Sequence, residues 1–185
     1  MTAVSTLTWT VDDLAQLPDK GCRYEIIQGE LFVSRSPHFR HQNAADNICT
    51  ALKNWSRETE RGYVFSGVGV FFDLDEAVIP DVVWIRRESL DTIMDTAGHL
   101  TAAPDLAIEV ISPGDGARDQ KTKLELYSRR GVQEYWILDR IAQEIEVYRR
   151  GNDGLQYVAV VTGGEILTSP MLPGFECVGR SIFEL

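Results

Sequence analysis

The sequence has no apolar run long enough to cross a membrane as a helix. Apolar stretches such as 64–72 fall well short of the roughly 20 residues that span the hydrocarbon core of a bilayer. The first residues, MTAVSTLTWT, also lack the basic region, apolar run and small-residue cleavage site of a secretory signal. We therefore expect a cytoplasmic protein without a membrane span.

Cysteine is scarce, with Cys22, Cys49 and Cys177 as the only three in 185 residues. Their number is odd, they lie far apart, and none belongs to a C-x-x-C pair. This spacing excludes a disulfide framework and a cysteine-based zinc site. We expect all three to be reduced and mostly buried.

Basic residues are outnumbered, with 18 Lys and Arg against 28 Asp and Glu and a formal net charge of −10. Non-specific affinity for nucleic acid comes from Lys and Arg that replace counterions along the phosphates, so we do not expect a protein that coats nucleic acid. A nuclease is not excluded, because screening limits the reach of each charge to about 8 Å at physiological ionic strength. The segment 118–130, with a local balance of +3, is the only strongly basic stretch.

What the sequence does contain is typical of one globular domain, 1–185, with 44% apolar and 25% charged residues. Hydrophobic periodicity predicts two main helices, at about 39–58 and 118–130, the second ended by Gly131. Runs of Val, Ile and Phe between turn residues predict the strands. The full set adds a short helix after a capping box at Thr10 and Asp13, a hairpin in 23–34, buried strands at 62–74, 78–86, 104–111 and 132–138, and short strands at 144–150 and 155–161. The core order is helix, three strands, helix, strand.

Two acidic residues, Asp81 and Glu109, lie in strands that otherwise have the continuous apolar character of strands buried on both faces. A buried carboxylate without a partner is costly, so each requires a cation. Adjacent strands would also bring the two like charges together, and a hard divalent cation with oxygen ligands relieves both problems. The pattern predicts a Mg²⁺ site, against the alternative that Asp81 beside Pro80 is only a turn former.

Two lysines, Lys121 and Lys123, follow Glu109 after a short loop, at the start of a helix that returns to the same end of the sheet. An ammonium there would orient or help deprotonate a metal-bound water and offset charge that develops on the phosphorus centre. The alternative is that both lysines belong to a solvated basic helix face.

The chain closely resembles the Uma-two family of "putative restriction endonucleases" in PDLAIEVISPGDGARDQKTKLELYSRRGVQEYWILD, RYEIIQGEL, IPDVVWI and His41. The resemblance runs from about Trp9 to Leu185, and the GVQEYWILD run after a K-x-x-x-Y helix is quite specific. This family is similar in fold to the PD-(D/E)XK nucleases, which share the core order of helix, three strands, helix, strand. The resemblance implies a restriction-endonuclease-like α/β core with an N-terminal hairpin and extra C-terminal strands.

The resemblance also assigns site residues. Asp81 after Pro80 matches the first acidic position of the PD-(D/E)XK motif, and Glu109 matches the second. Both are implied to bind Mg²⁺ or Mn²⁺, with the carbonyl of Val110 as a further ligand. The motif's lysine is missing, because Ile111 stands two residues after Glu109.

Lys123 is the predicted catalytic lysine, supplied by the helix instead. It lies one helical turn before Tyr127 and shares a face with it. Lys121 points roughly 200° away around the same helix, so only one of the two lysines can face the site. Lys123 and Tyr127 therefore join the expected catalytic set.

Glu25 and His41 are further candidates. Glu25 alternates with apolar neighbours in its strand, and is either an ordinary solvent-facing residue or one that binds a second metal or positions the site. His41, at the start of the first long helix, matches a family position and is expected to contact phosphate or pair with Glu25. His38 and His99 are expected on the surface or in loops.

Two functions are compatible with these residues. The first is metal-dependent hydrolysis of nucleic-acid phosphodiester bonds, with DNA as the expected substrate and a homodimer as the expected assembly. The second is a catalytically inactive binding or assembly module of the same fold, favoured by the acidic net charge and by Ile111. The set of Asp81, Glu109, Lys123 and Tyr127 favours the enzyme, which is the function we adopt.

Overall fold

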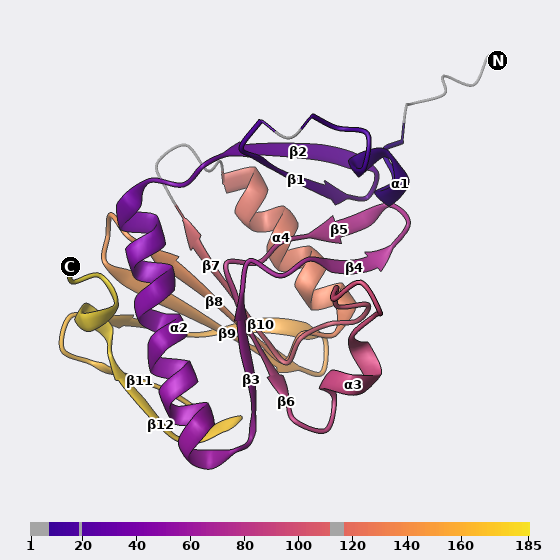
Figure 1. The fold of residues 1–185 in the computed structure, drawn as a ribbon. Helices are drawn as coiled ribbons and strands as arrows, with labels where there is room; N and C mark the ends of the chain where they lie inside the picture. Colours follow the sequence, from indigo (N-terminus) through magenta and orange to yellow (C-terminus); the bar gives the residue numbers. More distant parts are fainter. Residues whose placement is uncertain (1–7, 19, 112–116) are drawn as a thin grey trace.

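A six-stranded sheet forms the centre of the protein in a computed structural model that describes residues 8–18, 20–111 and 117–185 (Figure 1). The strand order is β10-β9-β8-β7-β6-β3, with β7 and β8 parallel and the other neighbours antiparallel. The strands are β3 (Gly62–Ser66), β6 (Val82–Arg86), β7 (Leu106–Ile111), β8 (Glu134–Asp139), β9 (Glu144–Gly151) and β10 (Gly154–Thr162). A parallel pair needs a crossover connection, which here contains a helix.

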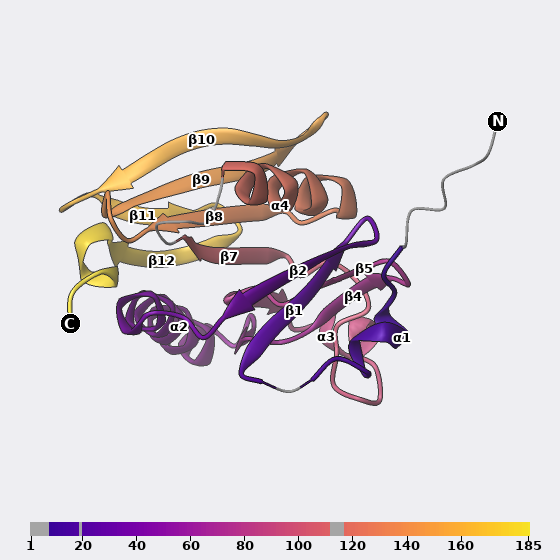
Figure 2. The same ribbon diagram turned by 90° about the horizontal axis from the view of Figure 1, so that it is seen from above.

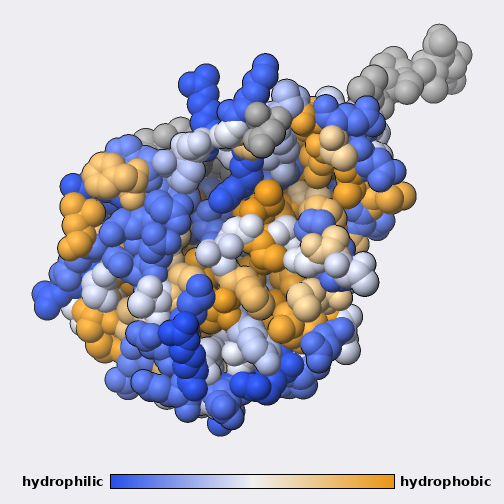
Figure 3. All heavy atoms as spheres, in the orientation of Figure 1, coloured by the Kyte–Doolittle hydropathy of each residue, from blue (hydrophilic) through white to orange (hydrophobic). Residues whose placement is uncertain are grey.

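Two long helices cover opposite faces of this sheet (Figure 2), α2 (Phe39–Thr59) on one side and the crossover helix α4 (Ala117–Arg130) on the other. Successive side chains of a strand point to opposite faces. In β8, Trp136 accordingly packs in the core beneath α2, and its neighbour Tyr135 packs in the core beneath α4. This burial on both sides explains the continuous apolar runs in the sequence. The outward face of α2 is hydrophilic (Figure 3).

A smaller sheet of four strands has the order β2-β1-β5-β4. Its strands are β1 (Cys22–Ile27), β2 (Glu30–Arg35), β4 (Val70–Asp73) and β5 (Glu76–Val78). The predicted hairpin is confirmed, but the prediction of single strands at 62–74 and 78–86 is wrong. β3 and β4 belong to different sheets, and so do β5 and β6. Gly67, with a φ of 63°, and Pro80, which has no N–H for a ladder, interrupt the two apolar runs.

The predicted core order is confirmed as α2, β3, β6, β7, α4 and β8. Among the outer elements, β12 adds Leu172 and Phe175 to the core on the α2 side. These outer elements are α1 (Val11–Leu14), which carries the predicted capping box, α3 (Leu90–Ile93), β11 (Ile166–Ser169), β12 (Leu172–Val178) and a 3-10 turn at Gly179–Ile182.

Within the described residues, no helix is long and apolar enough to cross a membrane. The cysteines are free, as predicted: Cys49 and Cys177 are buried, and Cys22 is half-buried. No disulfide therefore takes part in the architecture of the described chain.

Gly62→Ala tests the close packing of β3 against β6. A Cβ at Gly62 would overlap the carbonyl oxygen of Ile85 and the ring of Trp84, whereas a Cβ at Gly164 would meet no atom within 4 Å. We expect Gly62→Ala to lower the free energy of unfolding by about 1–3 kcal/mol, as overpacking does. Gly164→Ala should stay within about 0.5 kcal/mol of the wild type. Urea denaturation measures both, and equal midpoints for the two variants would contradict this packing.

Candidate functional site

Asp81 and Glu109 come together where two neighbouring strands meet. β6 and β7 pair antiparallel with Val82 opposite Ile108, so the residue before Val82 lies beside the residue after Ile108. The backbone N–H of Val110 donates to Oδ2 of Asp81 at 2.9 Å. Asp81 is 5% exposed and Glu109 is 6% exposed. The predicted meeting of two buried carboxylates on adjacent strands is confirmed.

Asp81 is held as a carboxylate by donors from distant parts of the chain. Nη1 of Arg23 lies 2.9 Å from Oδ1, and Nε2 of His41 lies 3.2 Å from Oδ2. Burial opposes ionisation of Asp81, but the hydrogen bonds from His41 and Val110 and the nearby positive charges outweigh it and lower the pKa to about 2. Asp81 is therefore ionised at neutral pH.

Glu109 has a different environment. Nζ of Lys123, at 3.0 Å, and the hydroxyl of Tyr127, at 2.7 Å, both donate to Oε1. Burial, with help from the negative charges of Asp81 and Glu25, raises the pKa of Glu109 above its ordinary value, and the charge of Lys123 only partly offsets this. Burial and the charge of Glu109 also raise the pKa of Tyr127, which keeps this hydroxyl a donor.

Lys123 bridges two carboxylates, because its Nζ lies 3.1 Å from Oε2 of Glu25 as well as 3.0 Å from Glu109. The prediction that Lys123 rather than Lys121 faces Glu109 is confirmed. Lys121 is exposed and pairs with Glu125 one turn along the helix. Glu25 is 6% exposed and accepts the backbone N–H of Ile79, so the solvent-facing alternative for Glu25 is wrong.

Two contacts differ from what the sequence indicated. His41 contacts Asp81 and not Glu25, because α2 packs over Val82 next to Asp81. Arg23 was not predicted at all, although it lies two residues before Glu25 and therefore on the same face of β1. That spacing of two was the signal in the sequence that could have identified Arg23.

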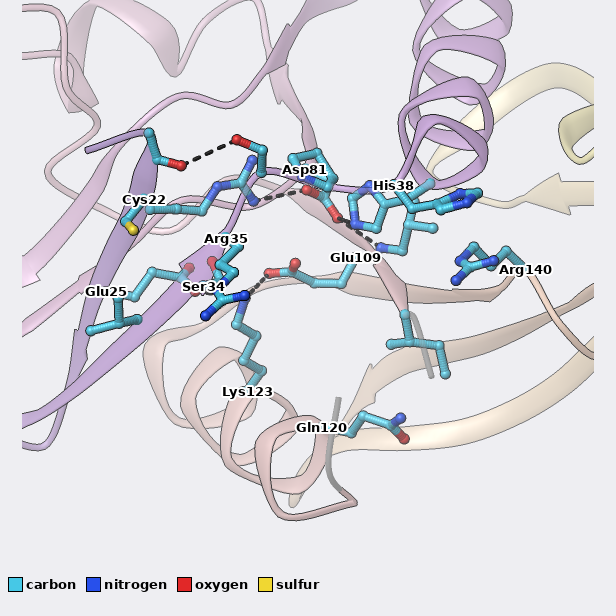
Figure 4. Close-up of a pocket in the computed structure, with 18 of the residues that line it drawn as sticks. Cys22, Glu25, Ser34, Arg35, His38, Asp81, Glu109, Gln120, Lys123 and Arg140 are labelled. Carbon is cyan, nitrogen blue, oxygen red and sulfur yellow. Dashed lines mark hydrogen bonds and ion pairs between the residues drawn. The ribbon is translucent and has the colours of Figure 1, made fainter. Parts of the chain in front are cut away.

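One cavity of about 610 Å³ (Figure 4) is lined by Arg23, Glu25, His41, Asp81, Glu109 and Lys123, whereas Tyr127 is not among its lining residues. Its walls come from the β1–β2 hairpin, the start of α2, the ends of β6 and β7, α4, and the turn after β8. Among the described residues, four basic and three acidic ones line it, although the chain as a whole is acidic. The basic residues are Arg23, Arg35, Lys123 and Arg140, and the acidic ones are Glu25, Asp81 and Glu109.

The oxygen atoms of Asp81 and Glu109 suit a hard divalent cation, which prefers carboxylate and carbonyl ligands and keeps several waters. Both donors to Glu109 contact Oε1, and no residue of the described chain donates to Oε2. The described residues contain no group of three or more His, Cys, Asp or Glu arranged to hold a metal. The ligands of a cation at this site would therefore be two carboxylates, a carbonyl, water and substrate. The cation would compete with Arg23 and Lys123 for the carboxylate oxygens.

The basic segment 118–130 forms no open cationic face over its described side chains. Arg129 and Arg130 both bind Glu76, which is 3% exposed. Lys121 is exposed but paired. Much of the positive balance counted from the sequence therefore neutralises buried acids, since a buried carboxylate needs a partner.

Lys123→Met tests whether one ammonium neutralises both buried carboxylates. We expect the variant to lose about 3–5 kcal/mol of unfolding free energy at pH 7, because Glu25 and Glu109 are left without their cation. Lys121→Met is the matched control on the same helix and should change stability by less than about 1 kcal/mol. Chemical denaturation measures both; a similar small loss in the two variants would show that the Lys123 bridge contributes little.

Glu109→Gln tests the pH dependence of stability. The pKa of Glu109 is higher in the folded state than in the unfolded chain. Protonated Glu109 therefore stabilises the fold at low pH, and this stability is lost as the pH rises through the folded-state pKa. Without divalent metal, the wild type should therefore lose more stability than Glu109→Gln between pH 5 and pH 8, by about 1.4 kcal/mol or more, the equivalent of one pKa unit. Urea denaturation at the two pH values measures this. Glu58→Gln, an exposed change on α2, should keep the wild-type slope, and parallel slopes for all three proteins would contradict the assignment.

Comparisons with known proteins agree with this architecture. A comparison with curated proteins gives no match. Among solved structures, the crystal structure of a "putative nuclease belonging to DUF820" from Anabaena variabilis matches with a TM-score of 0.78 and 18% identity over 94% of this chain and 97% of that chain. This likeness shows a restriction-endonuclease-like fold. The family model described as "Putative restriction endonuclease" matches residues 11–181, so the chain belongs to the Uma2 family.

Proposed function

We propose that this protein is a metal-dependent nuclease that hydrolyses phosphodiester bonds of DNA. One observation supports this above all others: Asp81 and Glu109 are buried side by side in a cavity, with Lys123 bonded to Glu109. The descriptions of the family and of the similar structure, a restriction endonuclease and a nuclease, support the same class of reaction.

Mg²⁺ or Mn²⁺ would be held by Asp81, Glu109 and the carbonyl of Val110. The N–H and C=O of one residue in an extended strand point to the same side. Since the N–H of Val110 is bonded to Asp81, its carbonyl is directed to that side as well. When bound, the cation would lower the pKa of a water molecule and polarise the phosphate.

The chain's own residues keep the reacting groups in place. Tyr127 donates to Oε1 of Glu109 and so orients this carboxylate with Oε2 left for a ligand. Arg23 at Oδ1, and His41 and the Val110 N–H at Oδ2, orient Asp81. Lys123 would hold its proton at Nζ and offset the negative charge that develops on the phosphate oxygens.

The second candidate is a catalytically inactive binding or assembly module. One observation favours it: Asp81 and Glu109 already have protein cations as partners, so the fold does not need a metal to neutralise them. The two candidates differ in whether the purified protein cleaves nucleic acid at all.

A cleavage assay with plasmid and single-stranded DNA separates the two candidates. We expect cleavage with Mg²⁺ or Mn²⁺, none with EDTA, and none with Ca²⁺, which binds oxygen ligands more loosely and activates water poorly. Asp81→Asn and Glu109→Gln should each lower the rate at least about 100-fold, since metal ligation supplies several kcal/mol of transition-state stabilisation.

The control is Asp91→Asn, the same change of charge at an exposed carboxylate of α3, which should cleave like the wild type. Equal residual cleavage by wild type and Asp81→Asn would identify a contaminating nuclease. A wild type that is inactive with every metal and substrate would favour the binding module.

A further inference from the structure

The two carboxylates of the proposed site are almost fully buried in the wall of the cavity. Asp81 and Glu109 are 5% and 6% exposed, and the surrounding cavity holds about 610 Å³. That volume is typical of a pocket for a small ligand. The β1–β2 hairpin, the segment that follows it and the first turn of α2 form part of its walls.

A phosphate of double-stranded DNA would have to enter this cavity to reach the carboxylates. Duplex DNA is stiff, with a persistence length of about 50 nm, so a local protrusion of its backbone is costly. An unpaired nucleotide leaves the stack at far smaller cost and can enter a cavity of this size. The burial of both carboxylates therefore favours a strand that is not base-paired where it is cut.

An aromatic pair lies next to this cavity at the start of α2. His38 lines the cavity, and its ring lies 4.6 Å from the ring of Phe39, with an angle of 33° between the planes. Phe39 is 60% exposed. Nδ1 of His38 accepts the backbone N–H of Arg40, and the Arg40 guanidinium lies 5.4 Å from the Phe39 ring centre. These contacts order the exposed rings before a ligand arrives, which lowers the entropy cost of stacking.

One cation of the cavity is available for a phosphate that flanks the reacting one. Arg35, at the end of β2, is an exposed lining residue and has no ion-pair partner among the residues that the structure describes. Arg23 and Lys123, in contrast, are bonded to the buried carboxylates. A guanidinium matches the geometry of a phosphate group.

We infer that the substrate strand is unpaired at the point of cleavage, that a nucleobase next to the cut stacks on the His38–Phe39 pair, and that Arg35 binds an adjacent phosphate. This inference rests on the proposed function, since it names the substrate class of the same site. Aromatic stacking of bases beside a cationic groove is how many proteins bind single strands without sequence preference. Cleavage of one unpaired strand needs only one copy of the chain, in contrast to the homodimer expected for a double-strand cut.

Fluorescence anisotropy tests the inference with three labelled oligonucleotides of equal length: a single strand, its blunt duplex, and a fully abasic strand. Ca²⁺ replaces Mg²⁺, and a gel run afterwards checks that each oligonucleotide is intact. The wild type should bind the single strand at least about 10-fold more tightly than the duplex. Phe39→Ala should weaken binding of the single strand by about 5- to 150-fold, the effect of losing one stacked base, and leave binding of the abasic strand unchanged.

Two further variants complete the test. Leu74→Ala removes an equally exposed apolar side chain in the turn between β4 and β5 and should bind every oligonucleotide like the wild type. Arg35→Gln should weaken binding of the single and abasic strands alike and lower the salt slope by about one, as expected for a lost phosphate contact.

The inference would be overturned if the duplex bound as tightly as the single strand, or if Phe39→Ala left the affinity for the single strand unchanged. The cleavage assay could still support a nuclease in that case. Stacking without any cleavage would support the inference and overturn the proposed catalysis. Absence of binding to all three oligonucleotides would overturn both.

Discussion

The ion pairs of Lys123 join three separate parts of the fold. Its backbone belongs to α4, and its Nζ lies 3.1 Å from Glu25 of β1 and 3.0 Å from Glu109 of β7. Glu25 also accepts the backbone N–H of Ile79, just before β6, at 2.7 Å. The small sheet, the central sheet and the crossover helix therefore meet at one ammonium. Since buried charges are tolerated only with opposite partners and hydrogen bonds, the position of each neighbouring acid depends on this lysine.

The two central carboxylates are chemically distinct, although the sequence presents them as an equivalent pair. Asp81 accepts from Arg23, His41 and Val110, and its pKa is about 2. The pKa of Glu109 is raised by burial and by neighbouring acids. Environments that move two pKa values apart are typical of catalytic pairs. Glu109 is the carboxylate that gains most from a further cation, because burial penalises its charged form.

The features predicted from the sequence are those that local geometry determines. Helical periodicity separates Lys123 from Lys121, and apolar runs identify the buried strands. The features that were missed depend on pairing between distant segments, such as Ile26 of β1 opposite Ala77 of β5. This pairing turns β5 away from β6 and brings β1, with Arg23, to Asp81. Gly67 and Pro80 interrupt the two apolar runs, but the apolar residues on both sides of each led to the prediction of single strands.

The net charge of −10 is compatible with an anionic substrate because charge acts locally at this site. Screening over about 8 Å separates the cavity from most surface carboxylates. Among the described residues of the cavity, four basic residues face three acids. Arg23 and Lys123 are paired with those acids, so net positive charge in the cavity depends on Arg35, Arg140 and any bound divalent cation. An acidic surface would slow the approach of a polyanion, whereas contacts within the cavity would determine how tightly it is held. Affinity for nucleic acid should then come from a few ordered contacts and not from a broad cationic face.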